Sequence, residues 1–175
     1  MSKEDPTFCE KMKAEGKETY QYLTDSEIAR FIMESNSIEN ICREPTKEEM
    51  ETYRWFLEQK ELTPEIVRSF VWNVADRALL RIKRGMNVEV GNHSPIPGSG
   101  LVLVELTEIL AQANSEDGAP YLVHHAYETL HPFMDGNGRS GRVIWLWMMT
   151  RRKIYVRDYL FLRAWYYQSL EFDRR

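Results

Sequence analysis

The sequence predicts a single all-α domain with one short β-hairpin, because helical periodicity and helix-capping patterns cover most of the chain. Alternation of apolar and polar residues, which is typical of strands, is confined to residues 86–90. Seven consecutive apolar residues, 143–149, predict a helix that is buried on all sides at the centre of the fold. The length of 175 residues suits one domain of about six to eight helices around a single hydrophobic core.

Two capping boxes mark the first helix starts. In residues 24–27 and again in residues 46–49, a threonine and a glutamate three positions later can satisfy the first free amides of a helix. We expect the first helix to end near Asn40 and the second near Lys60. The inward face of the first helix follows helical spacing: Ile28, Phe31, Ile32 and Ser35.

A third, longer helix is expected to start at Thr63 and Pro64 and to run to Gly85. Its inward residues also follow helical spacing: Ile66, Phe70, Val74, Ala78 and Leu79. Beyond Gly85 the sequence alternates, and turn residues followed by prolines predict a hairpin over residues 86–97. Four more helices are expected, over about 101–113, 120–130, 138–152 and 159–171.

The composition excludes several classes of protein. The two cysteines, Cys9 and Cys42, make neither a disulfide framework nor a zinc ligand set, so we expect free thiols in a reducing cytoplasm. Acidic residues at the N-terminus leave no secretory signal. The longest apolar run is far short of the ~20 residues that a membrane-spanning helix needs. We therefore expect a cytoplasmic protein without a membrane partner.

The charge is unevenly distributed along the chain. The net charge is −4, yet residues 1–65 carry 9 basic and 16 acidic residues, whereas residues 139–175 carry 9 basic and 3 acidic residues. The isoelectric point near 5.7 gives no general attraction to nucleic acid, and we expect no nucleic-acid partner. The basic C-terminal part is compatible with binding of an anionic ligand.

Residues 131–142 combine the groups that phosphate chemistry needs. The glycines of this stretch let backbone amides turn toward a bound anion: Gly136, Gly138 and Gly141. Arg139 and Arg142 share a helical face and can grip neighbouring phosphates, and Asp135 suits Mg²⁺ beside them. His131 can accept a proton from a hydroxyl near neutral pH. Together these residues describe transfer of a phosphorus-centred group from a nucleotide to an alcohol.

The same stretch resembles the signature of the Fic family. Residues 131–142 match the pattern His-Pro-Phe-x-Asp/Glu-Gly-Asn-Gly-Arg-x-x-Arg at every specified position, and the similarity extends to the expected hairpin and to residues 163–167. The resemblance implies one Fic-type helical domain within residues 1–175. It also implies Mg²⁺-dependent transfer of AMP from ATP to a Ser, Thr or Tyr hydroxyl of a target protein.

The resemblance implies a role for each residue of the motif. His131 would be the general base, Asp135 the Mg²⁺ ligand and Phe133 the anchor of the loop in the core. Arg142 would hold the γ-phosphate of ATP. The residues between them would hold the α- and β-phosphates: Gly136, Asn137, Gly138 and Arg139.

Ser35, Glu39 and Asn40 resemble the inhibitory motif of the family, Ser/Thr-x-x-x-Glu-Gly/Asn. In a helix over residues 24–40, Ser35 and Glu39 lie one turn apart on the same face. In the family this glutamate pairs with the second arginine of the motif, here Arg142, and competes with the γ-phosphate. Its position resembles the subclass whose inhibitory helix precedes the core, which implies an autoinhibited enzyme. In some relatives the glutamate also supports removal of AMP, and the sequence leaves this alternative open.

The expected hairpin has two interpretations. It is either a simple connection or, as in the family, a flap that pairs with an extended stretch of the target by strand addition. The residues that would contact the target are Met86, Val88, Glu89 and Val90. The identity of the target, self-modification, homo-oligomer formation and the choice of ATP over other nucleotides stay open.

Other classes fit the sequence less well. His124, His125 and His131 are close in sequence, but no cysteine or His-Glu-x-x-His pattern completes a zinc site. The motif of phosphate-loop NTPases is absent from the sequence. A non-catalytic helical nucleotide sensor is the alternative to an enzyme, and His131 argues against it because phosphate binding alone needs no base.

Overall fold

The computed structural model describes residues 23–76 and 78–152, and within them the fold is all-α. The described residues form six α-helices and no sheet, with only two isolated β-bridges. In chain order the helices are α2 (Asp25–Ile38), α3 (Lys47–Leu57), α4 (Pro64–Val74), α5 (Gly100–Asn114), α6 (Pro120–Leu130) and α7 (Asn137–Arg151). The all-helical fold class is thereby confirmed.

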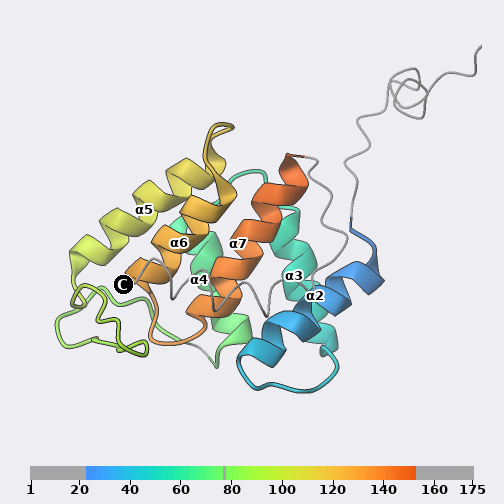
Figure 1. Ribbon diagram of the computed structural model, residues 1–175, viewed down its shortest axis with the longest axis horizontal. Helices are drawn as coiled ribbons and strands as arrows, with labels where there is room; N and C mark the ends of the chain where they lie inside the picture. The colour runs from blue at the N-terminus through green and yellow to red at the C-terminus, as the bar shows by residue number, and fades with distance from the viewer. Residues whose placement is uncertain (1–22, 77, 153–175) are drawn as a thin grey trace, which may run out of the picture.

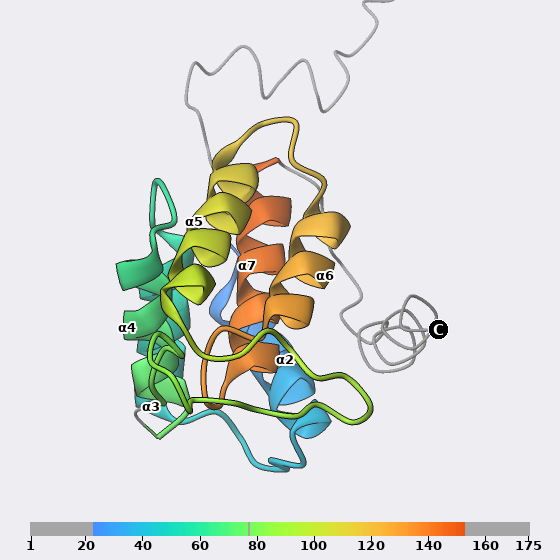
Figure 2. The same cartoon turned by 90° about the vertical axis from the view of Figure 1, so that its left-hand side faces the viewer.

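Helix α7 is the centre of the fold. It contacts each of the other five described helices, and Figure 2 shows α3 and α4 on one side of it and α6 on the other. The central residues of α7 are no more than 1% exposed: Val143, Ile144, Leu146, Trp147 and Met148. The apolar run thus forms the central helix that the sequence predicts, although it is not buried on all sides, because Trp145 and Met149 are half-buried. Its burial against five neighbours is a large part of what holds the domain together.

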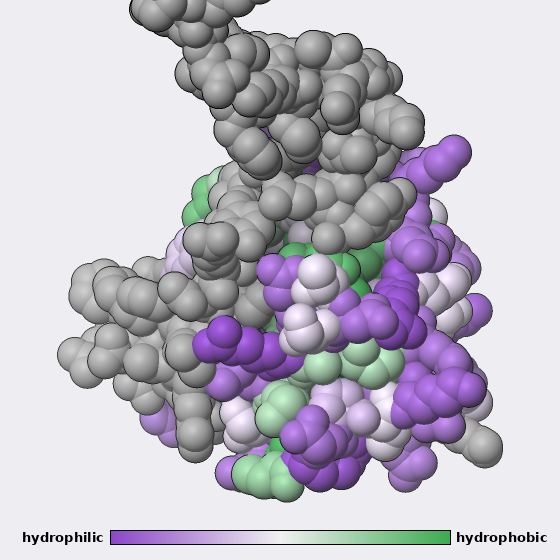
Figure 3. Space-filling view, turned by 90° about the vertical axis from the view of Figure 1, so that its right-hand side faces the viewer, coloured by the Kyte–Doolittle hydropathy of each residue, from purple (hydrophilic) through white to green (hydrophobic). Residues whose placement is uncertain are grey.

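The first helices begin where the capping boxes place them. Thr24 accepts a hydrogen bond from the backbone of Glu27 while the Glu27 carboxylate bonds back to Thr24, and Thr46 and Glu49 repeat this arrangement at the start of α3. The expected inward residues of α2 are all buried, and both helices end slightly earlier than predicted, at Ile38 and Leu57. Figure 3 shows the side of the molecule where α2 and α3 lie; its described surface is mostly hydrophilic with small hydrophobic patches.

The prediction that α4 extends to Gly85 is wrong. The helix ends at Val74, and Asp76 has a φ of 45°, which an α-helix cannot accommodate. Leu79, expected to point inward, is 56% exposed. The helical spacing of the sequence is overridden by tertiary contacts, because the chain after α4 runs extended and pairs with the loop after α6 through an antiparallel bridge between Leu80 and Phe133.

The prediction that residues 86–90 form a strand paired in a hairpin is also wrong. Val90 and His93 exchange two backbone hydrogen bonds of 2.9 and 3.0 Å around Gly91, but no further ladder forms among the described residues. Pro95 and Pro97 explain this, because they have no N–H to donate from the second arm. The alternation itself survives: Met86, Val88 and Val90 are half-buried, and the residues between them are exposed.

The remaining predicted helices over 101–113, 120–130 and 138–152 correspond to α5, α6 and α7. The helix expected over 159–171 and the similarity at 163–167 lie outside the described residues, as does Cys9. Among the described residues, no helix is both long and apolar enough to cross a membrane.

The seam between α6 and α7 is closely packed and contains a buried histidine. A Cβ at Gly141 would overlap the carboxylate of Glu128, so the Glu128 side chain packs directly against the backbone of α7. The Tyr127 and Ser140 hydroxyls share a hydrogen bond of 2.6 Å across the seam. Burial is the main cause that lowers the pKa of His124 to about 4; a hydrogen bond with the Gly141 backbone opposes this shift, and the nearby Arg142 and His125 add to it.

This burial makes the stability of the fold depend on pH. Between about pH 6.5 and pH 4 the unfolded chain protonates His124 while the folded chain does not, so stability is complete above this window and falls as the pH decreases through it. We expect His124→Gln to remove roughly 2–3 kcal/mol of this acid-induced loss, measured by urea unfolding at pH 7 and pH 4.5. An identical pH dependence in the wild type and the variant would contradict a neutral His124 in the fold.

Candidate active site

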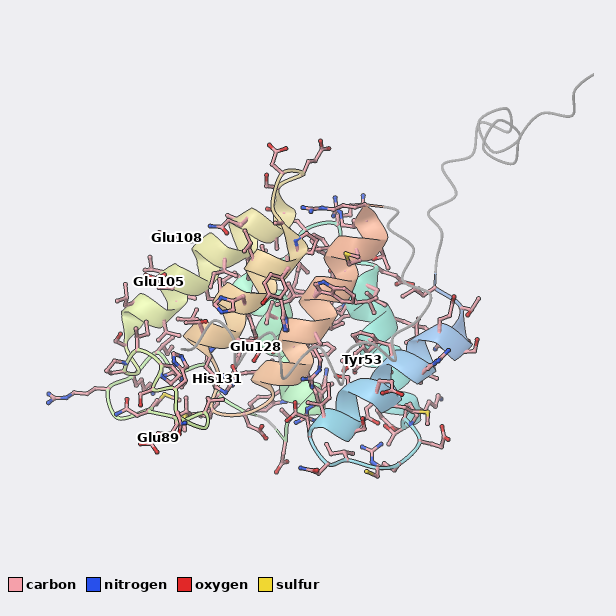
Figure 4. The ribbon with its side chains drawn as sticks, viewed as in Figure 1. Tyr53, Glu89, Glu105, Glu108, Glu128 and His131 are labelled. Atoms are coloured by element: carbon pink, nitrogen blue, oxygen red, sulfur yellow. The ribbon has the colours of Figure 1, made fainter. Side chains whose placement is uncertain are left out.

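The residues of the predicted site gather at one end of the molecule. The loop between α6 and α7, the N-terminus of α7, the C-terminus of α2 and the long connection between α4 and α5 all lie at the lower end in Figures 1 and 2. Figure 4 shows His131 at the end of α6, near the connection that carries Glu89. Segments from opposite ends of the described chain therefore meet around the start of the buried helix.

The side chain of Asn137 holds the loop between α6 and α7 in shape through hydrogen bonds to the loop backbone. The Asn137 amide accepts a hydrogen bond from the Phe133 N–H and donates one to the Phe133 carbonyl, both at 2.8 Å. The Phe133 side chain is fully buried, as the resemblance implies. Gly136 has a φ of 77°, and a Cβ there would overlap Ala75, so this turn requires glycine. The Asn137 side chain therefore organises the loop, and only its backbone is left to contact a phosphate.

The turn presents the free N-terminus of α7. The first hydrogen bond within the helix runs from the Ser140 N–H to the Gly136 carbonyl, so the N–H groups of residues 137–139 precede it. Such amides, together with the helix dipole, make an anion-binding site. Gly141, predicted to join this site, lies one turn further on against α6 and does not line it.

Asp135 and Arg139 flank the amides. The Asp135 side chain is 70% exposed, with Oδ1 accepting the Gly136 N–H at 2.6 Å and Oδ2 lying 3.9 Å from an Arg139 nitrogen. One exposed carboxylate beside an anion site fits Mg²⁺, which takes its other ligands from phosphate and water. In the described part of the chain, no group of three or more His, Cys, Asp or Glu side chains could hold a metal. A metal ion at Asp135 would thus depend on the oxygens of a nucleotide.

The guanidinium of Arg139 is less available than the sequence suggests. Arg139 is 8% exposed and donates a hydrogen bond to the carbonyl of Val74, the last residue of α4. Arg139 therefore lies in the first turn of α7 and caps the C-terminus of α4. This contact explains why α4 ends where it does, and it leaves only part of the guanidinium to face a phosphate.

His131 is fixed through its backbone on both sides. It ends α6 with a φ of 49° and a ψ of 62°, a left-handed conformation that costs a non-glycine residue on the order of 1 kcal/mol. Its N–H donates to the Tyr127 carbonyl at 2.9 Å, and its carbonyl accepts a hydrogen bond of 2.7 Å from Arg81. The residue is half-buried and directly precedes the loop that leads into α7.

Arg142 joins α7 to the end of α2. The residue is 1% exposed, and its Nε donates to the Ser35 hydroxyl at 2.8 Å while Nη2 donates to the Ser35 carbonyl at 3.0 Å. Nη2 also lies 2.6 Å from Oε1 of Glu39. The same carboxylate oxygen would be 2.5 Å from a Cβ at Gly138. The Glu39–Arg142 ion pair predicted from the sequence is therefore present, and Glu39 lies over the amides that begin α7.

The backbone at Asn40 shows why glycine or asparagine suits this position. Asn40 has a φ of 60° just after α2. The Ile41 N–H bonds back to the Asn36 carbonyl and the Asn40 N–H to the Ser37 carbonyl, which together form a Schellman motif. This motif needs a left-handed residue, a conformation that glycine and asparagine adopt most readily. Asn40 thus fixes the last turn of α2, which carries Glu39.

Arg81 is a residue of this region that the sequence analysis missed. It is fully buried and donates hydrogen bonds to backbone carbonyls on both sides of the site, among them that of His131. Its only signal in the sequence is a lone charge among the apolar residues of the segment 78–82. Nothing local in the sequence shows that the segment is extended.

The comparison with known families agrees with this geometry. Residues 82–149 match the model of a family described as Fic/DOC family. This part of the chain is a Fic/DOC family domain. The match spans most of the connection before α5, the site loop and most of α7, and it does not include Ser35, Glu39 or Asn40. No curated protein sequence matches the chain.

The Schellman motif at the end of α2 gives a test at one residue. We expect Asn40→Ala to lower the free energy of unfolding by about 1 kcal/mol, because alanine has a Cβ penalty in the left-handed conformation and no side-chain amide. Asn40→Gly should match or exceed the stability of the wild type. Urea unfolding of the three proteins measures the difference, and equal stability of the alanine and glycine variants would show that the helix end is not strained.

Proposed function

We propose that this protein transfers AMP from ATP to a hydroxyl group of a protein target. The observation that carries the proposal is the position of His131, which directly precedes a loop whose amides, Asp135 and Arg142 can surround a triphosphate. In the reaction the target hydroxyl oxygen attacks the α-phosphorus, and its proton passes to the His131 imidazole. The bond between the α-phosphorus and the bridging oxygen breaks, and pyrophosphate leaves with the electron pair.

The chain supplies positioning and charge for this step. The N–H groups of residues 137–139 and the exposed part of Arg139 would bind the α- and β-phosphates, and Arg142 would bind the γ-phosphate. Asp135 would hold Mg²⁺, which when bound neutralises the charge that develops on the phosphates. The fixed backbone of His131 keeps the base in place while the target hydroxyl approaches.

The target would dock on the connection between α4 and α5. Met86, Val88 and Val90 form one half-buried side of an extended stretch, and Glu89 is exposed on the other. Because this stretch has no ladder partner among the described residues beyond the turn at Val90, its backbone can pair with an extended segment of a target. Whether a second copy of this chain can be that target is tested by self-labelling.

We further propose that the enzyme is autoinhibited by Glu39. The carboxylate holds the Arg142 guanidinium at 2.6 Å, where the γ-phosphate would need the same donor, and adds a negative charge beside the phosphate site. Arg142 has three of its contacts on α2, so the inhibitory end of α2 is attached to α7 even before a nucleotide arrives. ATP then binds without a productive arrangement of its phosphates.

Labelling from ATP tests the transferase and its inhibition together. With Mg²⁺ and α-labelled ATP, we expect the wild type to label itself and added protein only weakly. Glu39→Gly should give at least roughly tenfold more labelling, because the Arg142 donor that bonds to Glu39 becomes available to the nucleotide. Adding His131→Ala to this variant should abolish the signal. Glu44→Gly is a matched control, because Glu44 is exposed just after α2 and its side chain lies outside the Arg142 contacts.

Each result separates the proposals. Equal labelling by the wild type and Glu39→Gly would reject autoinhibition. Labelling that persists without His131 would reject its role as the base. ATP binding without labelling in any variant would favour the nucleotide sensor, and release of AMP from a labelled target by the wild type alone would favour the reverse activity.

Nucleotide binding gives a test that needs no target. Replacing Glu39 by glycine frees Arg142 for the γ-phosphate, so Glu39→Gly should bind ATP about tenfold or more tightly than the wild type. ADP lacks that phosphate, and its affinity should change less than about threefold. Calorimetric titration of both nucleotides measures the difference, and an equal gain for ADP would show that Glu39 does not compete with the γ-phosphate.

A further inference from the structure

Arg81 bonds to two segments that the proposed reaction must hold together. Its guanidinium donates to the carbonyls of Leu130 at 2.8 Å and His131 at 2.7 Å, which end α6. It also donates to the carbonyls of Met86 at 3.2 Å and Ile96 at 2.9 Å, one on each arm of residues 86–98, the proposed docking segment. One side chain therefore links the backbone of the base to both arms of the docking segment.

The main chain of Arg81 adds to the link. Its N–H donates to the Pro132 carbonyl at 2.8 Å, and its carbonyl accepts the Ser99 N–H at 3.0 Å. The first bond lies next to the bridge between Leu80 and Phe133, which joins this segment to the loop after α6. The second holds the residue that precedes α5, where the docking segment ends. Arg81 thus contacts the catalytic loop and the docking segment through both its backbone and its side chain.

The partners of this buried charge are unusual. Arg81 is 0% exposed, and no carboxylate of the described residues forms an ion pair with it, so its four side-chain hydrogen bonds all go to carbonyl oxygens. Burying a cation is costly unless its donors are satisfied, and the five N–H donors of a guanidinium can bond to several fixed acceptors at once. Lysine, with donors on one atom, could not span these positions.

The packing of the docking segment supports this arrangement. Gly98 is so close to the opposite arm that a Cβ there would lie 2.5 Å from the Lys83 carbonyl and 2.6 Å from the Met86 carbonyl. A separate hydrogen bond of 2.8 Å joins the His93 ring to the Thr129 carbonyl. The base of the segment is therefore rigidly built, and two side chains attach it to the last residues of α6.

We propose that Arg81 is a positioning residue that sets the distance between the docked target hydroxyl and the His131 imidazole. This inference rests on the proposed function. The docking segment fixes the target, and His131 accepts its proton. A guanidinium bonded to both keeps their relative position constant, while the phosphate site at α7 is built without it. Loss of Arg81 should then impair transfer to the hydroxyl more than nucleotide binding.

The experiment compares variants in the released background Glu39→Gly. Arg81→Lys keeps the charge, Arg81→Met keeps most of the volume, and Arg84→Met is a matched control because Arg84 is exposed in the same segment. Both Arg81 variants should lower kcat for AMP transfer roughly 10–100-fold, the scale expected of a misplaced reacting group. The KM for ATP should change less than about threefold, and Arg84→Met should change neither value.

Amide hydrogen exchange provides a readout that does not depend on activity. In the Arg81 variants, exchange should rise together in residues 86–98 and 130–134 and stay unchanged in α2, α3 and the centre of α7. His93→Ala should raise exchange in the docking segment alone, because Arg81 remains in place. If Glu39→Gly with native Arg81 transfers no AMP, the proposed function fails, while the exchange data still decide whether Arg81 links the two segments.

Three outcomes would overturn the proposal. The first is an unchanged kcat in both Arg81 variants. The second is a fall in kcat that is matched by an equal fall in the fraction of protein that binds ATP, because that pattern describes unfolding and not mispositioning. The third is an increase of exchange in only one of the two segments, which would show that Arg81 supports each separately.

Discussion

The positive charge of Arg142, buried in the first turns of the central helix, determines how the N-terminal part of the described fold docks. A guanidinium without water must find acceptors, and α7 has none to offer at that position. Ser35 and Glu39 provide them from a helix more than a hundred positions earlier in the chain. The attachment of the end of α2 to α7 and the proposed control of the phosphate site both depend on the same buried charge.

The elements that the sequence predicts well are those with local causes. The capping boxes at Thr24 and Thr46 define helix starts within four residues of chain, and the apolar run in α7 identifies the buried centre. The motif loop is also predictable, because glycine at position 136 and asparagine at position 137 act on their immediate neighbours. In these places sequence distance and contact distance are both short.

The errors have causes that lie far away in the sequence. The end of α4 is set by Arg139, which is 65 positions from Val74, and by pairing of the next segment with the loop after α6. Arg81 is missed for the same reason, since the partners of its side chain lie up to 50 positions away. Helical spacing in residues 75–85 is compatible with both a helix and an extended segment, and only the tertiary partners decide between them. The role of Gly141 depended on the neighbouring helix in the same way.

The place of Glu39 at the very end of its helix has a kinetic consequence. Glu39 is the C-cap of α2. The last turn is closed by backbone hydrogen bonds from residues 39–41 to the carbonyls of Asn36 and Ser37. Helix ends fray within microseconds and at small cost, whereas removal of a whole helix from a core is slow and expensive. If Glu39 inhibits, the wild type opens by fraying of a single turn while Ser35 still holds Arg142. Basal activity is then a property of local helix melting, and a partner that only loosens this turn would suffice as an activator.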